Sequence, residues 1–158
     1  MTESSTNNIR VLDIKYGTSV DGIGLRTSIY CAGCAHCCPG CHNPQSWDFK
    51  GGQEMSVQEL LDIIKDDEFA NVTFSGGDPL YQVEAFTELA RRIKEETGKT
   101  IWCYTGFTYE EVLADESLSQ ILPYLDALVE GPFIQELRTT DIPFRGSTNQ
   151  RIIPNPGR

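Results

Sequence analysis

Five cysteines crowd into one eleven-residue stretch of this chain, Cys31-Ala-Gly-Cys34-Ala-His-Cys37-Cys38-Pro-Gly-Cys41. Cysteine is otherwise scattered and buried as a small apolar residue, so five thiols within reach of one point are difficult to explain by packing. Thiolates are ligands for zinc and for iron–sulfur clusters. The stretch therefore predicts a metal site, and the open questions are which thiols bind and what they hold.

Zinc, a redox dithiol and a disulfide framework are the alternatives to an iron–sulfur cluster. Cys31-x-x-Cys34 and Cys38-x-x-Cys41 could bind zinc, but three residues separate these pairs, whereas structural zinc sites usually separate them by about a dozen or more. A thioredoxin-type dithiol uses a single C-x-x-C at the start of a helix. Disulfides are rare in the cytosol. An iron–sulfur cluster is larger, and successive thiolates of one loop can surround it, so the short spacings favour it.

The composition predicts a single cytoplasmic domain. No apolar run of about 18 residues occurs, and the first eight residues lack the charged and apolar regions of a signal peptide. A chain of 158 residues, 39% of them hydrophobic, can build one core, so we expect a disordered tail over residues 1–8 and one domain over residues 9–158. A net charge of −10 disfavours a nucleic-acid partner, and no membrane partner is expected.

Hydrophobic periodicity predicts strands and helices that alternate along the chain. Two capping boxes, Ser56-Val-Gln-Glu59 and Thr108-Tyr-Glu-Glu111, mark the starts of helices, and Gly98 is placed to end one. The predicted helices cover about 56–66 and 83–96, with a third from 108 onward. The predicted strands cover 9–14, 25–30, 72–75, 100–104, 127–130 and, as a short last strand, 152–153.

This alternation predicts an α/β fold with a mostly parallel sheet. A closed eight-stranded barrel takes about 250 residues, so we expect an incomplete (partial) β/α barrel, open along one side. Ligands of such folds collect at the carboxyl ends of the strands. The cysteine loop, Ser75-Gly-Gly-Asp78, Thr105-Gly106 and Glu130-Gly131 all follow predicted strands, so we expect them to gather on one rim.

One cysteine spacing stands out within the loop. Cys-x3-Cys-x2-Cys occurs once, because a second start at Cys37 would need a cysteine at the position of Pro44; its members are Cys34, Cys38 and Cys41. This spacing resembles the cluster motif of the radical S-adenosylmethionine superfamily.

The segments around the cysteines resemble one branch of that superfamily, the glycyl-radical-enzyme activases. Val20-Asp-Gly-Ile-Gly-Leu-Arg26, Cys41-His-Asn43 and Ser75-Gly-Gly-Asp78-Pro79 are similar to activase segments. The tail resembles the anaerobic ribonucleotide reductase activases in particular, through Val129-Glu-Gly-Pro-Phe133 and Phe144-Arg-Gly-Ser-Thr-Asn-Gln-Arg151. Two residues depart from the usual pattern: Gly40 stands where many relatives carry an aromatic residue, and Ile23 replaces a proline.

The resemblance implies a 4Fe-4S cluster with three cysteine ligands, Cys34, Cys38 and Cys41, and an open iron that binds S-adenosyl-L-methionine. It implies cofactor contacts from Gly40, Cys41, His42, Asn43, Ser75, Gly76, Gly77, Asp78, Thr105 and Glu130. Asp78 would accept hydrogen bonds from the cofactor ammonium; the alternative is a turn capped by Asp78 and Pro79. For Thr105 and Glu130 the alternative is ordinary polarity at a strand end.

The remaining cysteines and several tail residues have less defined roles. Cys31 and Cys37 are interpreted as bystanders, and Cys103 as a core residue. Four polar residues could bind the cofactor carboxylate or the backbone of a protein substrate: Arg26, Arg145, Asn149 and Gln150. For the two arginines, the default alternative is an ion pair at the surface.

The activity implied by the resemblance is reductive cleavage of S-adenosylmethionine to form a glycyl radical on a protein. The expected partners are the large catalytic subunit of anaerobic (class III) ribonucleotide reductase and a small electron-donor flavoprotein. The alternatives are activation of another glycyl-radical enzyme, and a non-catalytic iron–sulfur or zinc-binding module.

Overall fold

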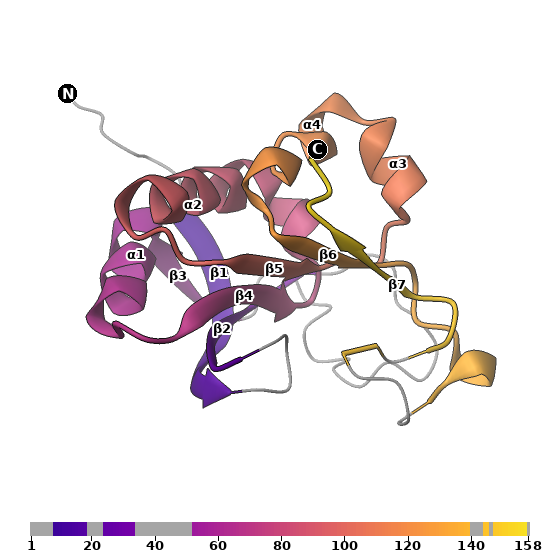
Figure 1. Ribbon diagram of the computed structural model, residues 1–158, viewed down its shortest axis with the longest axis horizontal. Coiled ribbons are helices and arrows are strands. Elements are labelled where there is room, and N and C mark those ends of the chain that lie inside the picture. The colour runs from indigo at the N-terminus through magenta and orange to yellow at the C-terminus, as the bar shows by residue number, and fades with distance from the viewer. Residues whose placement is uncertain (1–7, 19–23, 34–51, 140–143, 146, 158) are drawn as a thin grey trace.

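A seven-stranded sheet with the order β3-β1-β2-β4-β5-β6-β7 organises the computed structural model (Figure 1). The structure describes residues 8–18, 24–33, 52–139, 144–145 and 147–157. The strands are β1 (Asn8–Thr18), β2 (Arg26–Cys31), β3 (Gln53–Ser56), β4 (Asn71–Gly76), β5 (Ile101–Tyr104), β6 (Ala127–Glu130) and β7 (Arg151–Pro154). The helices are α1 (Val57–Asp66), α2 (Val83–Glu96), α3 (Tyr109–Leu113) and α4 (Glu116–Ser119), with 3-10 turns η2 (Pro79–Gln82), η3 (Leu122–Tyr124) and η4 (Gln135–Leu137).

The strands of the sheet run mostly in one direction. β2, β4, β5 and β6 are parallel neighbours, whereas β1 is antiparallel to both β2 and β3, and β7 is antiparallel to β6. β3 therefore runs in the same direction as β2, and only β1 and β7 oppose the other described strands. The predicted α/β class with a mostly parallel sheet is confirmed.

Local signals in the sequence predict where the helices begin and end. Ser56 and Thr108 each form a capping box with the glutamate three residues later, so α1 and α3 begin where the sequence predicts. α2 has the predicted bounds, and Gly98 follows its end with a φ of 71°, a left-handed conformation suited to glycine. β3 is not predicted by the sequence, and β1 already begins at Asn8, which the sequence placed in the tail.

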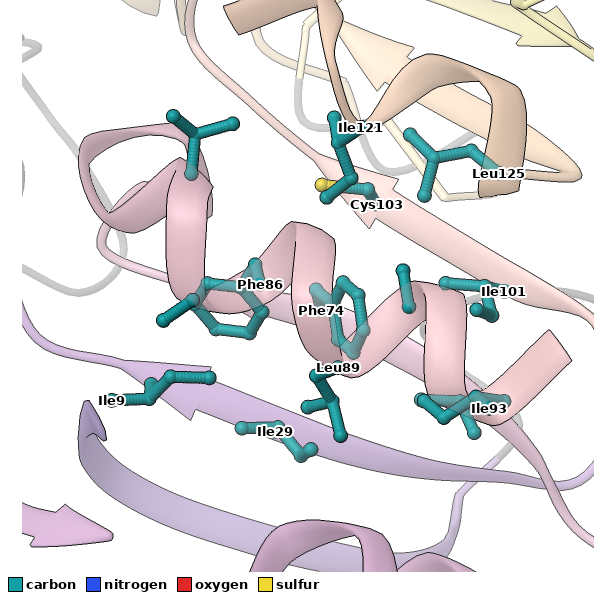
Figure 2. Packing of buried hydrophobic residues seen from close by; sticks show 14 of the residues in the cluster. Ile9, Ile29, Phe74, Phe86, Leu89, Ile93, Ile101, Cys103, Ile121 and Leu125 are labelled. Carbon is teal, nitrogen blue, oxygen red and sulfur yellow. The ribbon is translucent and has the colours of Figure 1, made fainter. Parts of the chain in front are cut away.

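The hydrophobic core lies between the sheet and the helices. Alternate strand residues point at α2, so that Ile29, Phe74 and Cys103 pack against Phe86 and Leu89 (Figure 2). All of these side chains are at most 1% exposed. Cys103 is a core residue, as predicted, and Cys31 at the end of β2 belongs to the same core.

The opposite face of the sheet has a different character. Its side chains alternate with those of the core and include Ser28, Thr73, Ser75 and Trp102. The buried residues of α1, α2 and α3 all belong to the core on the first side. We call this second side the open face of the sheet. No helix among the described residues is long and apolar enough to cross a membrane.

Candidate functional site

The carboxyl ends of the parallel strands meet at one rim, as the sequence predicts. The amide of Gly77, after β4, donates to the carbonyl of Cys31 at 2.8 Å, and the amide of Asp78 donates to the carbonyl of Gly33 at 2.8 Å. The start of the cysteine loop is therefore tied to the Ser75–Asp78 segment. The further predicted residues of that loop lie outside the described residues: Cys34, Cys37, Cys38, Gly40, Cys41, His42 and Asn43.

Gly76 allows β4 to end against β2. Its φ is 112°, and a Cβ at this position would lie 2.3 Å from the nitrogen of Cys31 and 2.5 Å from its oxygen. Backbone atoms cannot yield to such a contact, so a side chain is excluded here. The close approach that the glycine permits is made to the neighbouring strand.

Asp78 is buried at the centre of the rim. One carboxylate oxygen, Oδ1, accepts from the amide of Leu80 at 3.0 Å, which caps η2. The other, Oδ2, accepts from the Thr105 hydroxyl and from the Gly106 amide, both at 2.9 Å. The turn-capping role is therefore confirmed, while a hydrogen bond to the cofactor ammonium stays a prediction.

Thr105 connects the ends of β5 and β6 to this network. Its amide donates to the carbonyl of Val129, and its hydroxyl accepts from the amide of Phe107 while donating to Asp78. Only 6% of Thr105 is exposed. Its side chain thus holds the rim together, and a cofactor contact from it stays a prediction.

Glu130 at the end of β6 is enclosed by protein groups. Its Oε1 accepts from the Tyr109 amide at 2.6 Å and from Nη2 of Arg151 at 2.6 Å, and its Oε2 accepts from Nε of Arg151 at 3.2 Å. The same guanidinium contacts Glu110 at 2.8 Å. Glu130 and then Glu110 raise the pKa of Arg151, and Arg151 in turn lowers the pKa of Glu110. Contact of Glu130 with a cofactor also stays a prediction.

Ser75 differs from these residues, because strand alternation places it on the open face. It is the register partner of Tyr30, and Tyr104 lies on the same face of β5. Tyr30 and Tyr104 are not predicted from the sequence as residues of this surface. The alternation of polar and apolar residues in Arg26-Thr-Ser-Ile-Tyr30 is the signal that could have found this face.

The open face carries a buried hydroxyl and a buried guanidinium below the rim. Ser28 is fully buried, and its Oγ has no hydrogen-bond partner among the described residues. Arg26 donates to the Val72 carbonyl and to the side chain and carbonyl of Thr100. Burial lowers the pKa of Arg26 to about 10. Arg26 lies at the opposite end of β2 from the rim, so it supports the sheet there.

Residues of the tail motif form hydrogen bonds to the chain that follows β6. Asn149 donates to the carbonyl of Pro132 at 2.8 Å, and Gln150 donates to the carbonyl of Gly131 at 2.9 Å. Ser147 is fully buried, and its hydroxyl accepts from the Ile134 amide at 3.3 Å. Asn149 and Gln150 therefore hold the route of the backbone between β6 and β7.

Known proteins resemble this chain over most of its length. A family model described as a 4Fe-4S single cluster domain matches residues 20–153. An anaerobic ribonucleoside-triphosphate reductase-activating protein of Haemophilus influenzae is 37% identical over 141 residues, which cover 84% of this chain and 90% of the relative. Proteins of the same name from Vibrio cholerae and Escherichia coli are 39% and 34% identical, each covering 84% of this chain and 90% of the relative.

The matched range includes the elements that form the rim. The family model spans the described strands β2 to β6 and most of β7, together with the cysteine loop between β2 and β3. The chain therefore belongs to the family of anaerobic ribonucleoside-triphosphate reductase-activating proteins, with a 4Fe-4S cluster domain.

Proposed function

We propose that this protein is a radical S-adenosylmethionine enzyme that forms a glycyl radical on the large catalytic subunit of anaerobic ribonucleotide reductase. The observation that carries the proposal is the pair of hydrogen bonds between Cys31–Gly33 and Gly77–Asp78. This pair brings the loop that holds the cysteine motif against the segment that we expect to contact the cofactor. A small flavoprotein is the proposed electron donor.

The proposed architecture is an incomplete β/α barrel whose inner surface is the open face of the sheet. Its support is the separation of the two faces: the helices cover the apolar side, while hydroxyl and guanidinium groups occupy the other. A partial barrel suits a protein substrate, because a loop of the partner must enter whole. The polypeptide would enter along the side that the helices leave uncovered.

The proposed cluster ligands are Cys34, Cys38 and Cys41. Cys31 and Cys103 are not proposed as ligands, because both side chains are buried in the apolar core. The motif's three cysteines begin one residue after Gly33, at the rim, where a cluster would be accessible to a cofactor.

The residues proposed to contact S-adenosylmethionine are Gly40, Cys41, His42, Asn43, Ser75, Gly76, Gly77, Asp78, Thr105 and Glu130. Ser75 has the most direct support, because it faces the open side next to Tyr30. Asp78 and Thr105 would act mainly by fixing the shape of the rim. A reduced cluster held by the three cysteines would supply the electron for reductive cleavage of the S-adenosylmethionine bound by these residues, which is the chemistry that glycyl radical formation requires.

Cysteine variants test the proposal directly. Cys34→Ala, Cys38→Ala and Cys41→Ala should each lose the four-iron signal after anaerobic reconstitution, and none should give a glycyl radical with the reductase by electron paramagnetic resonance. Cys103→Ala is the matched control and should keep the iron. A wild-type cluster whose resonance spectrum does not change with S-adenosylmethionine would sink the proposal, and so would the absence of a glycyl radical in the reduced mixture.

A further inference from the structure

Arg145, in the tail motif, has a buried guanidinium nitrogen. The side chain is partly buried, and its Nε has no hydrogen-bond partner among the described residues. No ion pair of the described residues includes it. A partly buried charged donor without an acceptor is unfavourable, because it loses water contacts and gains nothing in exchange.

The residue that precedes Arg145 in the chain packs on the open side of the sheet. Phe144, its neighbour in the chain, packs edge-on against Trp102 with ring centroids 5.2 Å apart. Trp102 belongs to the cluster on that side, with Ala127 and Val129. The backbone at Phe144 has a φ of 67°, a left-handed conformation that is uncommon for a bulky residue.

A comparison with Arg26 shows why Arg145 is unusual. Arg26 also lies near Trp102, with its Cζ 5.6 Å from the ring centroid. Its donors are engaged by the carbonyls of Val72 and Thr100 and by the Thr73 hydroxyl. One arginine thus holds the strands together, whereas the Nε of the other has no hydrogen-bond partner among the described residues.

Trp102 lies below the rim of the sheet. It stands two residues before Tyr104, the last residue of β5, which corresponds to about 7 Å along the strand. A polypeptide loop that enters along the open face would pass the level of Trp102, where Phe144 precedes Arg145.

We propose that Arg145 binds backbone carbonyl oxygens of the glycine-containing loop of the reductase; this rests on the proposed function. A loop centred on glycine offers few side chains, so recognition must rely on its backbone. Guanidinium presents five donors in a fixed plane, which suits two carbonyl groups at once. Phe144 and Trp102 supply an apolar border that limits competition from water.

Equilibrium binding of the reductase subunit tests this role without requiring radical formation. The cluster-loaded protein with S-adenosylmethionine would be titrated anaerobically with fluorescently labelled reductase. Arg145→Gln should weaken binding by about tenfold, as expected for loss of a charged hydrogen bond worth roughly 1.5 kcal/mol. Arg145→Lys keeps the charge but loses the planar fork, and should lie between Arg145→Gln and the wild type.

Arg91→Gln is the matched control, because Arg91 lies on α2 at the helix-covered side and pairs with Glu95. It should bind the reductase like the wild type. Unchanged reductase affinity in a folded Arg145→Gln protein would overturn the inference. An equal loss of S-adenosylmethionine affinity without reductase would also overturn it, because Arg145 would then serve the cofactor. If the wild type bound the reductase but formed no glycyl radical, the proposed function would fail while the binding test of Arg145 still held.

Discussion

At the scale of single residues, Asp78 joins three of the loops at the rim, those after β2, β4 and β5. Its two carboxylate oxygens accept hydrogen bonds from the loops after β4 and β5, and its amide donates to the carbonyl of Gly33. Hydrogen bonds to a buried charged group contribute more than neutral ones, roughly 1.5 to 3 kcal/mol. One carboxylate therefore fixes where the cysteine loop starts relative to the neighbouring strand ends.

Asp78→Asn should lower the free energy of unfolding by about 2 kcal/mol, because the side-chain amide nitrogen of asparagine donates and cannot replace a carboxylate oxygen as the acceptor for Leu80 or for Thr105 and Gly106. Thr105→Val removes one of the same hydrogen bonds. The double variant should be less destabilised than the sum of the single variants, since the two residues share this bond. Anaerobic urea unfolding of the four proteins measures the coupling.

Thr87→Val is the control for these substitutions. The Thr87 hydroxyl is buried and has no hydrogen-bond partner among the described residues, so its removal should be neutral or stabilising. Strict additivity of Asp78→Asn and Thr105→Val would mean that the carboxylate and the hydroxyl act separately, against the geometry described for the rim.

At the scale of elements, the sequence predicts what local signals determine. Capping boxes at Ser56 and Thr108 give the starts of α1 and α3, and the bounds of α2 follow from its apolar face. β3 could not be predicted, because Gln53–Ser56 lacks β-branched and aromatic residues and forms by pairing with the distant β1. The engagement of Asp78 by Thr105, 27 residues away, is equally non-local. The local sequence pattern therefore predicts which residues lie at the rim, but not which residues they pair with or form hydrogen bonds to.

Arg151 and Glu130 link three elements at the end of the chain. Arg151 begins β7, Glu130 ends β6, and the Tyr109 amide at the start of α3 donates to the same carboxylate. Glu130 is 1% exposed, so these partners replace the water contacts of its carboxylate. The ion pair between Arg151 and Glu130 therefore holds β7 to the sheet, in addition to the backbone hydrogen bonds between β7 and β6.

Arg151→Met should destabilise the protein by about 2 kcal/mol, because it leaves a buried carboxylate without its cation. The loss stays below the roughly 3 to 5 kcal/mol of a fully buried pair, since Arg151 is half exposed. Adding Glu130→Gln should recover part of the stability, because the amide oxygen still accepts from Tyr109. Thermal unfolding measures both, and a double variant no more stable than Arg151→Met would refute this assignment.

At the scale of the whole molecule, the two faces of the sheet differ in the side chains that they carry. The helix-covered face contains the large apolar cluster, from Ile9 on β1 to Leu128 on β6. The open face holds Arg26, Ser28 and Thr73, polar groups that add little to a hydrophobic core. The large apolar cluster therefore lies on one side of the sheet, and buried polar side chains lie on the other.

The charge of the molecule predicts how its stability depends on pH. Backbone hydrogen bonds lower the pKa of Asp67, contacts with Lys65 and Arg92 lower that of Glu96, and Arg151 lowers that of Glu110. A carboxyl group whose pKa is depressed by folding stabilises the protein above its unfolded pKa, near 4, and loses this contribution as the pH falls through the folded pKa. Repulsion within a chain of net charge −10 acts oppositely, because it weakens as the pH approaches the isoelectric point of about 4.6.

Unfolding free energy should therefore change little from pH 7 to 5 and fall below about pH 4, where these three carboxylates become protonated. Lys65→Met should make the acid decline shallower, because the hydrogen bond from Lys65 is the largest cause of the lowered Glu96 pKa. Lys15→Met is the control, since Lys15 lies over the Tyr30 ring and should leave the decline unchanged. Urea unfolding at pH 7, 5, 4 and 3 measures the three curves. An equally steep decline in Lys65→Met and the wild type would show that this ion pair does not set the acid limit, and that general charge repulsion does.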